Sequence, residues 1–194
     1  DLPLRHQTLW NAIDWSYTLL SAVERAALRQ FAVFVGGWTL EAAEVIIDTV
    51  TNAADASQPT DAMPSLLDLL TALVSQSLVV VILREGVARY HLLESIREYA
   101  LDRLTECDEA TSARHRHAAY YLSLAEFPLF TVQESIWMDR LEQENENLRV
   151  ALAWTIEWAP ERILRLAEKL GWFWQVRGDV REGRRWLELA LERA

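Results

Sequence analysis

The residues with the clearest capacity for chemistry lie in the stretch 88–104, ARYHLLESIREYALDRL. The alternation typical of a strand runs as far as His91, and the spacing after Glu94 is that of a helix. An imidazole and a carboxylate three residues apart could form a catalytic acid–base pair or a ligand sensor. They could also lie at a simple bend between a strand and a helix, so the pair does not by itself define an active site.

The other candidate residues do not form a catalytic or metal-binding set. His115 and His117 lie two apart on a predicted helix, so they point about 200° apart and cannot hold one metal ion. Cys107 is the single cysteine, which excludes an internal disulfide and fits a reducing compartment. Glu142 and Glu146 belong to a charged stretch typical of a solvated helix face. The sequence therefore predicts no catalytic residue, no metal ligand and no enzymatic activity.

The composition is that of a folded, acidic protein. The chain has 194 residues, of which 51% are hydrophobic, so that a sizeable core can form. No apolar run approaches the roughly 18 residues that a membrane span requires, and the chain does not open on a signal peptide. We therefore expect a cytoplasmic protein without a membrane partner. The net charge of −10 repels phosphate groups, which predicts no direct nucleic-acid binding.

Hydrophobic patterns place the secondary structure along the chain. Apolar residues at helical spacing predict helices over 6–20, 22–35, 40–50, 63–75, 95–106, 109–127, 134–158, 161–177 and 180–194. Strand patterns predict one hairpin, with strands over 78–83 and 88–92 and a turn over 84–87. The polar stretch 51–62 is predicted to be a loop, and Pro128 and Pro160 mark two breaks between helices.

Capping residues support the helix starts. Ser21 and Glu24 form a capping-box pattern for the second helix, and the glycines at 36–37 are expected to end it. Thr39 can cap the third helix. Pro64 is expected in the first turn of the fourth helix, where a missing N–H costs least.

This order of elements predicts a mostly α chain in two parts. Helices followed by a hairpin are typical of a winged helix, and a long run of helices in hairpins is typical of a repeat superhelix. We therefore predict a winged-helix domain over 1–107 and an antiparallel α–α, tetratricopeptide-like region over 108–194. One repeat cannot bury its own apolar face, so the second region is expected to start a longer array.

The helix predicted before the hairpin is poorly suited to reading DNA. In a DNA-binding winged helix this element supplies donors to bases and cations to phosphates. The stretch 51–83 contains neither Lys nor Arg, and the predicted helix 63–75 carries Asp68 and a leucine face. The sequence therefore favours packing inside a larger protein, with a DNA-binding winged-helix regulator as the alternative.

The end of the chain resembles a tetratricopeptide repeat. The matching residues are Leu170, Gly171, Trp174, Gly178, Val180, Gly183, Leu187, Ala190 and Leu191. The small residues among them, including Gly171 and Gly183, are expected to let two antiparallel helices approach. The last helix is expected to carry an exposed apolar stripe. By this resemblance, the residues that line an inner groove and contact a partner are Arg165, Glu168, Trp172 and Gln175.

Six segments together resemble one family. In chain order they are RHQTLWNAIDWSYTLL, FVGGWTLEAAE, LLDLLTALVSQSLVV, RYHLLESIREYALDRL, RHRHAAYYLSLAE and LGWFWQVRGDVREGRRWLELAL. The chain is similar to bacterial multidomain signal-transduction ATPases of the STAND or NB-ARC type, including large LuxR-type and antibiotic-regulatory-type transcriptional regulators. It is more distantly similar to plant disease-resistance proteins and the apoptotic protease-activating factor.

The resemblance implies a division of labour within a longer protein. A nucleotide-binding domain comes first, the winged helix holds its ADP-bound inactive form, and the repeats sense an inducer or a protein partner. The chain itself lacks the pattern G-x-x-x-x-G-K-[ST]. We therefore expect no cofactor in this chain, with ATP or ADP bound by the parent protein, and the parent's own nucleotide-binding domain as a partner.

The opening stretch departs from the family at one position. Distant relatives carry a Met-His-Asp motif at this junction, whose histidine touches the β-phosphate of ADP. Here Leu92 and Glu94 match the first and third positions, whereas Leu93 replaces the histidine and His91 lies two residues too early. The resemblance thus implies a degenerate ADP-sensor corner made of His91, Leu93 and Glu94. A capping-box pattern from Ser95 is expected to start the following helix.

Overall fold

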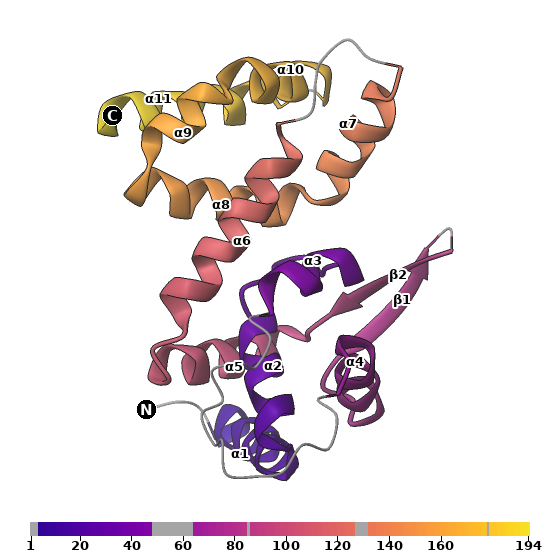
Figure 1. Cartoon of the computed structure of the whole chain (residues 1–194). Coiled ribbons are helices and arrows are strands. Elements are labelled where there is room, and N and C mark those ends of the chain that lie inside the picture. Colours follow the sequence, from indigo (N-terminus) through magenta and orange to yellow (C-terminus); the bar gives the residue numbers. More distant parts are fainter. Residues whose placement is uncertain (1–3, 48–63, 85, 127–131, 178) are drawn as a thin grey trace. The chain divides into compact units, whose positions relative to one another are not determined.

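The computed structural model describes residues 4–47, 64–84, 86–126, 132–177 and 179–194. The described chain is mostly helical with one two-stranded antiparallel hairpin, which confirms the predicted fold class at this level. The chain divides into two compact units, unit 1 (Asp1–Ala113) and unit 2 (Arg114–Ala194) (Figure 1). The domain assignment of 1–107 and 108–194 stays a prediction. The loop predicted over 51–62 lies outside the described residues, as do Pro128 and Gly178.

Unit 1 consists of helices around the base of the hairpin. Its elements are α1 (Leu4–Leu19), α2 (Ala22–Phe31), α3 (Leu40–Ile46), α4 (Leu66–Ser75), β1 (Val80–Arg84), β2 (Val87–His91), α5 (Glu94–Glu106) and the start of α6 (Ala110–Leu124). The capping box of Ser21 and Glu24 is confirmed, since each side chain accepts the backbone N–H of the other residue. Thr39 caps α3 as predicted, by accepting the N–H of Ala42.

Several predicted helix boundaries are wrong: α3 ends at Ile46 and not at 50, and three others differ where a cap or a first turn was expected. Helix α2 ends at Phe31 and not at 35, because the Ala32 N–H bonds back to the last turn and the chain then leaves the helix. Pro64 precedes α4, whose N-cap is Ser65 in a capping box with Asp68. Helix α5 begins at Glu94, so the expected cap at Ser95 lies inside the helix.

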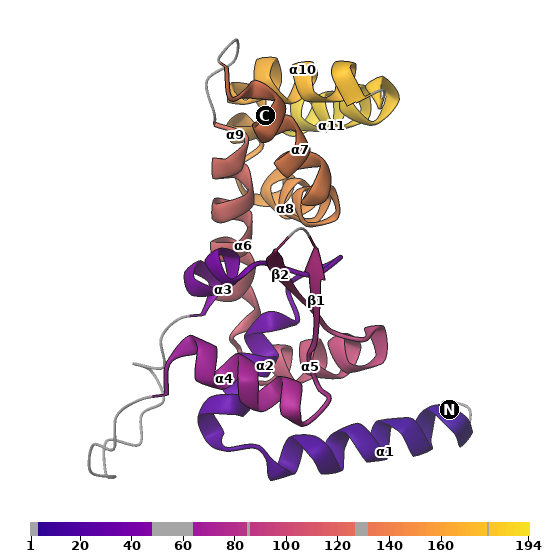
Figure 2. The same ribbon diagram turned by 90° about the vertical axis from the view of Figure 1, so that its right-hand side faces the viewer.

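A buried aromatic stack joins the helices of unit 1 to the hairpin. The Trp38 ring lies 4.9 Å from the Phe31 ring and 5.0 Å from the Phe34 ring, centre to centre. The backbone of Trp38 also pairs with Tyr90 of β2, with N···O distances of 2.9 and 2.8 Å in the two directions. Trp38 is 1% exposed, so these backbone bonds are sheltered from water. The hairpin extends beyond the helices of the same unit (Figure 2).

Unit 2 is entirely helical within the described residues. It contains most of α6, followed by α7 (Glu134–Gln143), α8 (Asn145–Trp158), α9 (Pro160–Arg165), α10 (Ala167–Arg177) and α11 (Val180–Arg193). The single helices predicted over 134–158 and 161–177 are therefore wrong, because the chain bends at Glu144 and at Leu166. None of the described helices combines the length and hydropathy needed to cross a membrane.

Polar contacts fasten α11 to its neighbours. The Arg149 guanidinium in α8 binds both carboxylate oxygens of Glu182 in α11, at 2.5 Å each. This contact holds the pKa of Glu182 at about 2. The Trp186 indole N–H donates to the same carboxylate, and Asp179 caps the helix by accepting the Glu182 N–H. The neighbouring residue of α11, Gly183, lies against the Trp174 ring of α10.

The two glycines of this helix pair predict opposite effects of alanine. At Gly183 a β-carbon would lie 2.5 Å from Cε3 of Trp174, whereas at Gly171 it would meet no atom within 4 Å. We expect Gly183→Ala to lower the free energy of unfolding by about 1–3 kcal/mol, as overpacking does. We expect Gly171→Ala to leave it unchanged or raise it by up to about 1 kcal/mol, because alanine favours a helix. Urea unfolding of both variants measures the difference, and equal losses would contradict the assignment of Gly183 to the interface.

Candidate functional site

The hairpin-to-helix corner places His91 directly against the glycine turn. Gly37 has a φ of +87°, which only glycine adopts without strain. A β-carbon at this position would lie 2.5 Å from both Cε1 and Nδ1 of His91 and 2.6 Å from the Tyr90 carbonyl oxygen. Gly37 is therefore required both by its backbone conformation and by the closeness of the imidazole. The two glycines predicted to end α2 instead form a turn after it, and Gly37 of this turn lies against His91, the last residue of β2.

Arg89 holds the same turn from the neighbouring position on β2. Its Nε donates to the Gly36 carbonyl at 3.3 Å, and its Nη2 donates to the Gly37 carbonyl at 3.2 Å. Since residues two apart in a strand share a face, Arg89 and His91 both point at the turn. Arg89 was not predicted as a site residue, and its only signal in the sequence is the strand face that it shares with His91.

Leu93 and Glu94 have different surroundings from His91. Leu93 occupies the N-cap position of α5, makes no side-chain cap, and exposes 56% of its surface. Glu94 binds the Arg97 guanidinium with both oxygens, at 2.6 and 3.0 Å. The hydrogen bonds from Arg97 lower the pKa of Glu94, so its carboxylate stays charged and engaged. An exposed leucine cannot donate to a phosphate, and the role of the corner in sensing ADP stays a prediction.

The four residues predicted to contact a partner lie on two helices of unit 2. Arg165 ends α9, whereas Glu168, Trp172 and Gln175 belong to α10, because the chain bends at Leu166 between them. Arg165, Glu168 and Gln175 are exposed. Trp172 is half-buried, and its indole N–H donates to Oε1 of Glu134 in α7 at 2.8 Å. The partner role of these residues stays a prediction, and the Trp172 N–H already serves the packing of α10 on α7.

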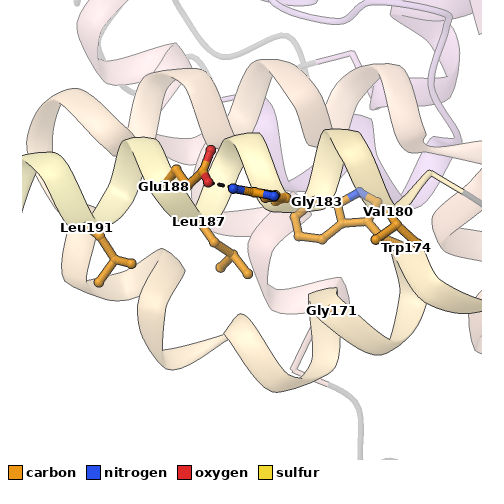
Figure 3. Close-up of a pocket in the computed structure, with 8 residues that line it drawn as sticks. Gly171, Trp174, Val180, Gly183, Leu187, Glu188 and Leu191 are labelled. Atoms are coloured by element: carbon orange, nitrogen blue, oxygen red, sulfur yellow. Dashed lines mark hydrogen bonds and ion pairs between the residues drawn. The ribbon is translucent and has the colours of Figure 1, made fainter.

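A separate apolar groove lies between α10 and α11. Its volume is about 280 Å³, and its lining consists of Gly171, Trp174, Val180, Gly183, Arg184, Leu187, Glu188 and Leu191 (Figure 3). Leu187 and Leu191 project from α11 on the side of Gly171, and Leu191 is 67% exposed. Arg184 and Glu188 form an ion pair at the rim, 2.7 Å between Nε and Oε1. The groove contains the exposed apolar stripe expected on the last helix.

Gly171 has a different role from the one expected of it. The sequence pattern assigned it to the approach of α10 and α11, but no atom lies within 4 Å of a β-carbon placed there. The space over Gly171 opens into the groove. Of these two glycines, Gly183 is the one that lies against a side chain of the facing helix.

A buried polar chain in unit 2 was not predicted. The Oδ1 atom of Asn147 lies 3.3 Å from Nε2 of His117, and the Asn147 amide donates to Oε2 of Glu144 at 3.0 Å. All three side chains are at most 5% exposed. Since the amide N–H₂ faces the carboxylate, the Asn147 oxygen faces the imidazole, whose Nε2 must carry the proton. Burial lowers the pKa of His117 to about 4, so the imidazole is neutral at neutral pH.

Within the described ranges, no group of three or more His, Cys, Asp or Glu residues is arranged to hold a metal ion. His115 and His117 have separate environments: His115 is exposed near Trp154 and Trp158, and His117 is buried.

Comparisons with known proteins identify relatives among mycobacterial regulators. Proteins of Mycobacterium tuberculosis and Mycobacterium bovis, each named "Putative HTH-type transcriptional regulator", are 39% identical to the chain over 192 residues. The match covers 97% of this chain and 20% of each relative, so the chain spans about a fifth of their length. An uncharacterized M. tuberculosis protein is 38% identical over 111 residues, covering 57% of the chain and 26% of that protein. No family model and no solved structure matches the chain.

The buried imidazole predicts that acid weakens unit 2. His117 stays neutral down to about pH 4 in the folded chain, whereas in the unfolded chain it binds a proton near its ordinary pKa of 6.5. The unfolded state therefore gains protons first, and we expect the free energy of unfolding to fall by about 2 kcal/mol from about pH 7 to about pH 5. Denaturant unfolding across this pH range measures the effect.

The matched variants are His117→Gln and His115→Gln, which remove a buried and an exposed histidine from the same helix. The first should remove about 2 kcal/mol of the pH dependence, whereas the second should leave it nearly intact. An unchanged pH dependence in His117→Gln would contradict the assignment.

Proposed function

We propose that this chain is a regulatory, protein-interaction module of a larger transcriptional regulator. The observation that carries the proposal is the 39% identity to the mycobacterial regulators, because it extends over 97% of the chain. The chain corresponds to only 20% of those proteins. In this proposal it acts through contacts with other parts of such a protein and has no catalytic role of its own.

In this proposal the first part is a winged-helix domain and the second is the start of a tetratricopeptide-like array. The first assignment is supported by the three helices α2, α3 and α4 followed directly by the hairpin. The second is supported by the close packing of Gly183 on Trp174 and by the apolar groove that α10 and α11 leave open. A following helix of the array covers this groove.

The parent protein is a cytoplasmic signal-transduction ATPase of the STAND or NB-ARC type, of the LuxR or antibiotic-regulatory kind. Its nucleotide-binding domain, outside this chain, holds ATP or ADP and is the partner that the winged helix restrains. The repeats take an inducer or a protein at the face of Arg165, Glu168, Trp172 and Gln175. The ordered set of family-like segments supports this scheme, as does the lack of a phosphate-binding loop in the sequence.

The corner gives a test of this scheme in a full-length protein that carries the nucleotide-binding domain. We expect Leu93→His to raise ADP affinity by about tenfold to a hundredfold, because one hydrogen bond to a charged phosphate stabilises by about 1.5–3 kcal/mol. His91→Ala should change the affinity less, since that imidazole lies against Gly37. Calorimetric titration with ADP measures both.

Leu67→His, on an equally exposed leucine of α4, is the matched control and should leave ADP affinity unchanged. Equal affinity in the wild type and Leu93→His would count against the corner as a sensor. The 194-residue chain alone should show no saturable ADP binding, and micromolar binding by it would contradict the assignment of the nucleotide to another domain.

A DNA-binding winged helix is the second candidate, since the relatives are named as HTH-type regulators. Helix α4, which would enter the major groove of DNA, presents Leu67 and Asp68 to solvent, and the stretch 51–83 contains neither Lys nor Arg. We therefore expect no gel shift of duplex DNA by this chain, even at low salt where phosphate contacts are strongest. A retarded band that weakens steeply with added salt would favour the second candidate.

A further inference from the structure

The outer edge of β1 carries unpaired backbone groups whose positions follow from the contacts of Tyr90. Both the N–H and the C=O of Tyr90 bond to Trp38, on the side of β2 that faces away from β1. The pair Val81↔Tyr90 is therefore of the type that exchanges no hydrogen bonds, and by alternation so is Leu83↔Ala88. The N–H and C=O of Val81 and Leu83 consequently point away from β2, to the open edge.

These groups find no partner within the part of the chain that the structure describes. The sheet consists of β1 and β2 alone, so nothing extends it beyond β1. The side chains on both faces of the strand are also exposed: Val80 by 39%, Val81 by 41%, Ile82 by 39% and Leu83 by 74%. Proteins usually protect such an edge with lysine, proline or a bulge, and residues 80–83 contain no charge and no proline.

We propose that the β1 edge pairs antiparallel with β1 of a second copy of this chain, which joins the two hairpins into one continuous sheet. The register is set by the outward groups. Val81 lies opposite Leu83 of the other copy and exchanges two backbone hydrogen bonds with it. By the twofold symmetry, Leu83 of the first copy pairs in the same way with Val81 of the other. Ile82 then lies opposite its own copy on the axis.

The match between the two edges favours a second copy over an unrelated strand. The two outward residues are two apart, so a twofold axis between them satisfies all four groups without an offset. Every cross-strand pair within 81–83 joins aliphatic side chains, and two of the three residues, Val81 and Ile82, are β-branched, which is the residue type that stabilises a sheet. Isologous pairing also shields the edge-facing sides of these aliphatic side chains in both copies at once.

Cysteine cross-linking tests the register in the whole 194-residue chain with Cys107→Ser as background. In the proposed register Ile82 and Ile82 of the other copy form a pair that exchanges no hydrogen bonds. The Cα atoms of such a pair lie about 4.5 Å apart, within the roughly 4.4–6.8 Å that a disulfide spans. We therefore expect Ile82→Cys to give a covalent dimer under mild oxidation. In the same register Val80 lies about 14 Å along the strand from its own copy, so Val80→Cys should not cross-link.

Association itself is measured by sedimentation over a concentration series. Lysine at position 81 enters the interface twice by symmetry, so we expect Val81→Lys to raise the dimer dissociation constant about tenfold or more. Leu67→Lys on α4 replaces a side chain that is 55% exposed, against 41% for Val81, and that lies away from the edge, so it should leave the dissociation constant unchanged. Hydrogen exchange at the Val81 and Leu83 amides should slow as the concentration rises, while the amides of Val80 and Ile82 already bond to β2.

The proposal is overturned if the chain stays monomeric at every concentration and Ile82→Cys fails to cross-link, which would leave the edge to another protein. It is also overturned if Val80→Cys cross-links as readily as Ile82→Cys, or if Leu67→Lys abolishes association and Val81→Lys does not. These outcomes do not depend on nucleotide or DNA binding, so they are separate from the tests of the proposed function.

Discussion

The pairing of Trp38 with Tyr90 is the constraint on which the rest of unit 1 depends. Two backbone hydrogen bonds, sheltered by the rings of Phe31 and Phe34, fix β2 to the segment after α2. Because β2 is fixed, His91 comes to rest on Gly37 and Arg89 reaches the carbonyls of the same turn. The same two bonds decide which backbone groups of β1 face outward. One local contact thus sets both the corner and the open edge.

In unit 2 the corresponding constraint is a set of buried polar contacts between helices. The chain of His117, Asn147 and Glu144 joins α6 to the bend between α7 and α8, and its members cannot be separated without leaving a buried group unpaired. Arg149 and Glu182 then hold α11 against α8. Apolar packing brings these helices together, but the polar contacts specify where each helix bends and which face it turns inward.

The parts of the fold that could be predicted are those that neighbouring residues determine. The caps at Ser21 and Thr39 depend on contacts three residues away, and the sequence shows both partners. The bend at Glu144 could not be predicted, because the side chain that stabilises it reaches through Asn147 to His117, on another helix. Gly171 and Gly183 look alike in the sequence, and only the position of Trp174 separates their roles. At the corner, the predicted residues are adjacent in the chain yet have unlike environments.

These environments bear on what the corner can transmit. Glu94 is held by Arg97, His91 is seated on Gly37, and Leu93 offers only apolar surface. Leu93 can therefore contribute to such a corner by packing but not by a hydrogen bond to a phosphate. The exposed side chains of β1 at 80–83 have the same character, since they are all aliphatic, and the charged residue of this strand is Arg84 at its end. The β1 edge is suited to protein contacts, because apolar area and open backbone groups attract another strand.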